Sequence, residues 1–154
     1  MISIREAEEG DAEACSQVLC ASIRELCVAD HHRDADLVAQ WTANKTPERI
    51  VRWVADPHVT LFLAEHDGAP AGVGGVSENG EILLNYVAPL CRFRGVSRAM
   101  LAHMEQTLRE RGVRMARLTS TETAHRFYRS AGWTDVGDPE VVLGIRGYPM
   151  VKDM

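Results

Sequence analysis

A short basic turn holds the residues whose types and spacing best suit chemistry: Arg92, Phe93, Arg94, Gly95, Val96 and Ser97. A helix with one apolar face is predicted to begin at this turn. The first N–H groups of a helix lack partners, and the helix dipole adds positive charge there. Gly95 allows close backbone approach, and the arginines concentrate positive charge. The turn is therefore predicted to bind a pyrophosphate, although a lone turn of this kind also suits a purely structural role.

A second segment lies between Thr121 and Trp133 and contains the pair Phe127-Tyr128. It is predicted to form a short helix that ends at Gly132 and leads into a strand. Together, the two segments resemble the GNAT superfamily of acetyl-CoA-dependent N-acetyltransferases. That family carries an Arg/Gln-x-x-Gly-x-Gly/Ala turn after its fourth strand and an Asn-x-x-Ala-x-x-Phe-Tyr-x-x-x-Gly-Phe-like segment after its fifth. The resemblance covers roughly residues 62 to 154, and the last five residues look like the family's closing strand.

The resemblance implies that an acetyl group moves from acetyl-CoA to a primary amine by direct attack in a ternary complex. In the family the fourth strand splays from the fifth and exposes backbone groups to the pantetheine arm. Asn85, Tyr86 and Val87 occupy that place here, so a main-chain N–H among them is expected to bond the acetyl carbonyl. Pantetheine would then lie along Tyr86 and Val87, and the pyrophosphate on the N–H groups of residues 93 to 97. Asn85 could also simply accommodate a bulge.

Tyr128 is the candidate general acid, because tyrosine at this position is the family's usual proton donor to the CoA sulfur. A phenol of pKa ~10 is protonated at neutral pH, and proton transfer to a thiolate of pKa ~8.5 is uphill by only about 2 kcal/mol. The alternative interpretation is a packing aromatic beside Phe127. In the first interpretation Tyr128 also contacts the bound cofactor.

Glu81 is the weaker candidate for the general base. It lies six residues before Val87, where the histone-acetylating branch of the family places its glutamate. Because six is even, Glu81, Asn85 and Val87 share a sheet face if no bulge intervenes. A glutamate after Asn79-Gly80 is also an ordinary solvated start of a strand, and water or another acid could serve as the base instead.

Two residues depart from the family pattern. Ser97 stands where the family usually has Gly or Ala, and its hydroxyl could either donate a hydrogen bond to phosphate or crowd the turn. Thr121 stands where Asn is frequent; it can still cap its helix, but it reaches less far toward the cofactor than an amide. Both departures concern cofactor affinity and leave the predicted fold unchanged.

The composition agrees with one acetyltransferase domain over residues 1–154. The chain is 45% hydrophobic and 25% charged, and its formal net charge of −5 argues against nucleic acid as the main partner. No apolar run approaches the ~20 residues that span a bilayer, and the N-terminus has no signal-peptide pattern, so neither membrane nor export is expected. The four cysteines are expected to be reduced thiols in the cytoplasm.

The periodicity predicts an α/β (α+β) fold with a mixed sheet of about six or seven strands and helices on both faces. The resemblance implies that the fourth and fifth strands splay apart. Asp11 is predicted to cap the first helix, and Thr46 with Pro47 the start of a later one. A polar break at residues 29–33 should precede a helix around 37–41. Strands are predicted near residues 2–5, 59–65, 71–77, 82–87 and 116–119.

The acceptor is open: a small amine, an amino acid, an antibiotic or a protein N-terminus all fit. The segment from Cys20 to Trp41 would line its pocket, where several acidic residues could favour a cationic amine or form a solvated helix face. His31, His32 and Asp34 lack the spacing of metal ligands, so no metal is expected. A cofactor-sensing or interaction module on the same fold is the competing class of function. A homodimer through residues 141–154 is expected from the resemblance alone.

Overall fold

The computed structural model describes all 154 residues and contains eight strands, one or two more than predicted. The strands are β1 (Ile2–Glu6), β2 (Val59–His66), β3 (Ala69–Ser77), β4 (Ile82–Val87), β5 (Met115–Ser120), β6 (Thr134–Asp135), β7 (Glu140–Val142) and β8 (Ile145–Asp153). The helices are α1 (Ala12–Leu26), α2 (Val28–His31), α3 (Ala35–Thr42), α4 (Pro47–Ala55), α5 (Val96–Glu110) and α6 (His125–Ser130). Short 3-10 turns cover Glu9–Asp11 and Pro89–Cys91.

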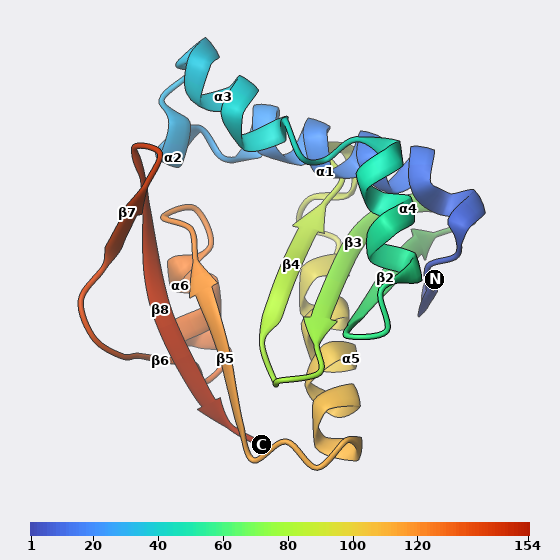
Figure 1. The fold of residues 1–154 in the computed structure, drawn as a ribbon, viewed down its shortest axis with the longest axis vertical. Coiled ribbons are helices and arrows are strands. Elements are labelled where there is room, and N and C mark those ends of the chain that lie inside the picture. Colours follow the sequence, from blue (N-terminus) through green and yellow to red (C-terminus); the bar gives the residue numbers. More distant parts are fainter.

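The strands form two antiparallel sheets that stand side by side (Figure 1). The first has the order β1-β2-β3-β4, and the second has the order β5-β8-β6, with β7 also paired to β8. Because β8 is paired along both edges, the free edge available for the expected homodimer is the one that β6 and β7 form. Self-association itself stays a prediction.

The two sheets join at one point, the parallel bridge between Glu81 and Arg117 at the start of β4. Arg117 N donates to Gly80 O at 3.0 Å there, and beyond this bond β4 and β5 diverge (Figure 1). This divergence confirms the splay predicted for the fourth and fifth strands. The chain itself crosses from β4 to β5 through α5.

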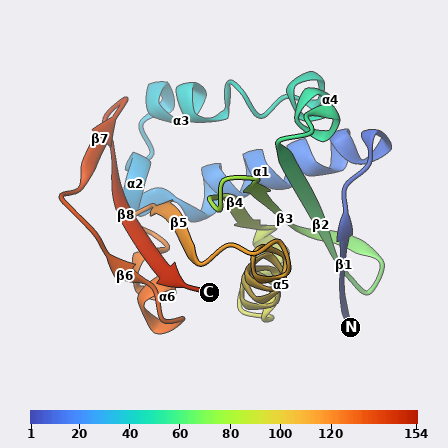
Figure 2. The same cartoon turned by 60° about the horizontal axis from the view of Figure 1, so that its bottom comes forward.

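Helices cover both faces of the first sheet, with α1 and α4 on one side and α5 on the other (Figure 2). Helix α5 lies very close to β3: a Cβ added at Gly74 would come within 2.6 Å of the Met100 sulfur. The glycines of β3 therefore let the two elements pack at short range.

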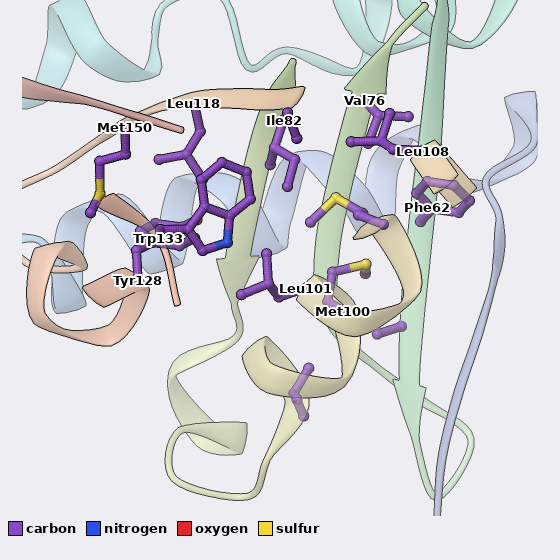
Figure 3. Packing of buried hydrophobic residues seen from close by; sticks show 14 of the residues in the cluster. Phe62, Val76, Ile82, Met100, Leu101, Leu108, Leu118, Tyr128, Trp133 and Met150 are labelled. Atoms are coloured by element: carbon purple, nitrogen blue, oxygen red, sulfur yellow. The ribbon is translucent and has the colours of Figure 1, made fainter. Parts of the chain in front are cut away.

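One buried cluster spans both sheets and compensates for the single bridge between them. It contains Ile82 from β4, Leu118 from β5 and Met150 from β8, with Leu101 of α5 and Trp133 among them (Figure 3). The buried carboxylate of Glu105 in α5 accepts bonds from Trp133 Nε1 (3.1 Å) and Lys152 Nζ (2.8 Å). Helix α5 thus holds the second sheet against the first.

Three predicted helix starts have different outcomes. Thr46 caps α4 through Arg49 N (3.2 Å), with Pro47 at the first helical position, as predicted. Asp11 precedes α1 but does not cap it, because its carboxylate binds Arg5 (2.7 and 2.9 Å) and Glu8 N (2.8 Å) instead. The predicted polar break contains a short helix, α2, and Asp34 then caps α3 through the N–H groups of residues 36 and 37.

None of the helices is both long enough and apolar enough to cross a bilayer. All four cysteines are free thiols.

Candidate active site

Hydrogen bonding to β3 leaves alternate backbone groups of β4 facing the gap between the sheets. In an antiparallel pair, only every second residue exchanges both of its hydrogen bonds with the partner strand. The bond from Ala88 N to Ala71 O (2.7 Å) sets this alternation, so the backbone of Tyr86 faces Val73 on β3. The N–H groups of Asn85 and Val87 therefore point toward the gap, where β5 does not pair with β4.

The basic turn has the backbone shape of an anion site. Phe93 and Gly95 both have positive φ angles, 66° and 84°, and Gly95 is the residue that precedes the first turn of α5. No acidic side chain lies in that first turn. The unpaired N–H groups at this helix end and the nearby arginines would stabilise a bound anion.

A cavity of about 440 Å³ lies between these two features and is called the central cavity here. Most of the predicted site residues line it: Asn85, Tyr86, Val87, Arg92, Phe93, Gly95, Val96, Ser97 and Tyr128. The remaining walls come from α1 and from the segment that leads into α6, and Cys91 also contributes. The structure thus brings together residues of β4, the turn and α6 that are far apart in sequence.

Three predicted site residues lie outside the central cavity. Arg94 is exposed in the turn, and Thr121 lines a neighbouring cavity of about 50 Å³ in the gap between β4 and β5, called the gap cavity here. Glu81 lines neither of them. The register of β4 shifts at this end, since Gly75 pairs with Leu84 but Val76 pairs with Ile82. The condition for Glu81 to share a face with Asn85 and Val87 is therefore not met.

Tyr128 is buried at the wall of the central cavity, with 6% of its surface exposed. Its ring packs edge-on against Phe127 (5.2 Å between centroids) and Trp133 (6.2 Å). Desolvation raises the pKa of its hydroxyl to about 12, and a contact with the Asn85 side chain offsets part of that rise. The phenol is consequently protonated throughout the neutral range.

The Asn85 side chain has an unsatisfied acceptor that fits a ligand such as coenzyme A. Asn85 Nδ2 makes a long contact of 3.5 Å to Ser97 O. Asn85 Oδ1 is buried and has no hydrogen-bond partner. Buried polar atoms normally find a partner, so this oxygen suits an N–H or O–H donor on a bound molecule. The pantetheine arm of coenzyme A carries amide N–H donors, and the turn at residues 92–97 suits the pyrophosphate of the same molecule.

A further pocket of about 250 Å³, called the hairpin pocket here, lies between α3 and the β7–β8 hairpin. It shares Tyr86 with the central cavity and shares Tyr86, Thr119 and Thr121 with the gap cavity. Burial raises the pKa of the Tyr86 hydroxyl, and the neighbouring Trp41 side chain lowers it in part. Of the segment predicted to line an acceptor pocket, Gln40 and Trp41 face this pocket.

Asp30 is one of the acidic residues in the segment predicted to line an acceptor pocket, but its carboxylate positions part of the site instead, a role that the sequence did not indicate. Its carboxylate, 6% exposed, accepts bonds from Glu122 N (2.7 Å), Thr123 N (3.2 Å) and Thr123 Oγ1 (2.5 Å). These bonds tie α2 to the loop between β5 and α6, where Thr123 and Ala124 line the central cavity. No local pattern marks such a residue, because its partners lie more than ninety positions away.

A family model described as the acetyltransferase (GNAT) domain matches residues 23–154, most of the chain. The chain belongs to the GNAT acetyltransferase family. No curated protein sequence matches it significantly.

Solved structures of other GNAT proteins have the same fold as this one. A GCN5-related N-acetyltransferase from Rhodopseudomonas palustris is 18% identical, with a TM-score of 0.88 over 99% of this chain and 95% of that one. The PaiA N-acetyltransferase from Thermoplasma acidophilum, solved with coenzyme A, is 17% identical, with a TM-score of 0.83 over 100% and 99%. The ribosomal-protein-S18-alanine N-acetyltransferase from Escherichia coli is 17% identical, with a TM-score of 0.66 over 98% and 91%.

Proposed function

We propose that this GNAT protein transfers an acetyl group from acetyl-CoA to a primary amine by direct attack within a ternary complex. The observation that carries the proposal is the divergence of β4 from β5, which opens the N–H groups of Asn85 and Val87 to the central cavity. The pairing of β1 with β2 supports treating residues 1–154 as one acetyltransferase unit.

In this proposal the residues around the central cavity bind the donor. The N–H groups at the start of α5 hold the pyrophosphate, together with Arg92 and Arg98, which both line the central cavity. Asn85 Oδ1 accepts from a pantetheine amide, and the arm lies along Tyr86 and Val87. Acetyl-CoA supplies the activated thioester carbonyl, whose oxygen receives a hydrogen bond from the N–H of Asn85 or Val87. That bond stabilises the negative charge that develops on the oxygen during attack.

Tyr128 donates the proton that the departing CoA sulfur needs. From a phenol of pKa about 12 to a thiolate of pKa ~8.5, the transfer is uphill by roughly 5 kcal/mol. A turnover of ~10 s⁻¹ corresponds to a total barrier of about 16 kcal/mol, so this cost is compatible with catalysis. The same high pKa keeps the donor protonated at every pH near neutrality.

The attacking amine must lose a proton, and we propose that solvent water receives it. Glu81 remains the carboxylate suggested by the resemblance, but the shifted register of β4 does not bring it to the central cavity or the gap cavity. A role for Glu81 would need a chain of water molecules between it and the amine.

Titration calorimetry with CoA, followed by an assay of CoA release with a panel of primary amines, tests the proposal. Saturable binding and amine-dependent release are expected. Binding without release from any amine would favour the sensing or interaction module.

A further inference from the structure

The hairpin pocket has apolar and aromatic walls. Trp41 of α3 and the ring of Tyr86 face residues 142, 143 and 145 of the β7–β8 hairpin across it. Val142 and Leu143 are 63% and 64% exposed, although both are large aliphatic side chains. Walls of this kind suit the hydrocarbon part of a small molecule.

The strand register determines which charged side chain faces this pocket. Directly opposed residues of an antiparallel pair lie on the same face of the sheet, and alternate residues lie on opposite faces. Glu140 pairs with Gly147 and Val142 with Ile145, so these four share the face that lines the hairpin pocket.

Arg146 pairs with Val141 and therefore belongs to the other face of the hairpin. There it borders a separate hollow with Val141 and Tyr148. The contact with Glu122 raises the pKa of the Tyr148 hydroxyl, and the positive charge of Arg146 lowers it in part. Arg146 borders both the hairpin pocket and the outer hollow, and the register places its side chain on the face of the outer hollow. The carboxylate of Glu140 is thus the charged group on the pocket face, and it forms no salt bridge within the chain.

The distance between this carboxylate and the gap cavity follows from the order of the strands. Val136 N donates to Pro149 O (2.9 Å), so the chain continues from β6 to β7 along one edge of β8, opposite to β5. Two interstrand spacings, about 10 Å, separate β5 from β7. An acceptor that reaches from the gap cavity to Glu140 therefore needs a linker of roughly four to eight atoms.

We infer that the acceptor is a small amine with a second cationic group, joined to the first by an apolar linker. This inference rests on the proposed acetyl transfer and adds the substrate class. The reacting amine lies in the gap cavity, the linker contacts Trp41 and Leu143, and the second cation pairs with Glu140. The aromatic faces of Trp41 and Tyr86 also favour a cation nearby.

Three amines of matched length test the substrate class: 1,6-diaminohexane, hexylamine and 6-aminohexanoate. The kcat/KM for the diamine is expected to exceed that for hexylamine about tenfold, the effect of one charge-assisted hydrogen bond, with 6-aminohexanoate slowest. Glu140→Gln should bring the ratio of diamine to hexylamine close to two, the value expected because the diamine has two equivalent amines, and Glu140→Lys should favour 6-aminohexanoate. Asp138→Asn, which removes an exposed carboxylate nearby, should leave the ratio at its wild-type value.

Calorimetric titration of 1,6-diaminohexane into the CoA-saturated protein separates the two proposals. Turnover of all three amines at similar kcat/KM, or a diamine preference well above twofold that survives Glu140→Gln, overturns the substrate class while acetyl transfer stands. Diamine binding that Glu140→Gln weakens, without turnover of any amine, overturns acetyl transfer and supports the site. Absence of both binding and turnover overturns both.

Discussion

Asp30 accepts a 2.5 Å hydrogen bond from the hydroxyl of Thr123, a residue 93 positions further along the chain. This bond fixes α2 to the loop that enters α6, and α6 carries Tyr128. The wall of the central cavity therefore depends on a buried carboxylate far from the predicted motifs.

Asp30→Asn should loosen this loop, because an amide cannot accept all three bonds that the carboxylate accepts. The expected loss of stability is roughly 1–3 kcal/mol, accompanied by weaker CoA binding. Denaturant unfolding and calorimetry measure the two effects. In a double-mutant cycle with Thr123→Val the two changes should be non-additive, whereas simple additivity would mean that the contact does not hold the loop.

Gly95→Val should weaken CoA binding about tenfold or more, since a side chain at φ 84° strains the turn and projects where the phosphate is proposed to lie. A Cβ at this position meets no protein atom within 4 Å, so the fold should survive with a cost of about 1–2 kcal/mol.

Gly112→Val is the matched control for this change. Gly112 lies just beyond the other end of α5, with φ 81° and equally open surroundings. It should lose a similar amount of stability but keep CoA affinity. Equal loss of affinity in both variants would assign the effect to the helix in general and not to the turn.

Tyr128→Phe should lower kcat by about 10²–10⁴-fold, because general acid catalysis is typically of that size. The ring and its packing on Trp133 remain, so the melting temperature and the Kd for acetyl-CoA should change little. With the pKa of the phenol raised to about 12, the wild-type kcat should show no loss of an essential acid between pH 7 and pH 10. Full kcat in the variant, under conditions where chemistry is rate-limiting, would make Tyr128 a packing residue.

The ion pair between Arg5 and Asp11 gives the protein an acid-sensitive contribution to stability. Hydrogen bonding to Arg5 lowers the pKa of Asp11 from 3.8 to about 2, so the stabilisation is present above pH 4 and is lost as the pH falls toward 2. Arg5 is nearly half exposed, which limits the contribution to roughly 1 kcal/mol.

Asp11→Asn should therefore lower the free energy of unfolding at pH 7 by about that amount and make almost no difference near pH 2. Urea unfolding of both proteins at several pH values measures this. A difference that does not change with pH would show that the charge on Asp11 is not the cause.

The turn at residues 92–97 and Tyr128 could be predicted to converge because each lies in a local motif with a fixed place in the family. The splay of β4 from β5 came from the same resemblance. The resemblance could not place Glu81 in the same way, because the sheet face on which its side chain lies depends on an unbroken alternation along β4. A single extra residue between Ile82 and Leu84 reverses that alternation.

The roles of Asp30 and Glu140 could not be predicted for a different reason. The partners of Asp30 are distant in sequence, and the orientation of Glu140 depends on the register of a short hairpin that no turn motif specified. Such contacts are set by the packing of whole elements and leave no periodic signal in the chain.

Acetyl transfer itself can be followed by measuring free CoA thiol and N-acetylated product together while the protein is mixed with acetyl-CoA and 1,6-diaminohexane or hexylamine. Thiol is expected to appear only when an amine is present, and acetylated product should form in equal amount. Saturable CoA binding with no amine-dependent thiol release, or thiol release without acetylated amine, would contradict acetyl transfer.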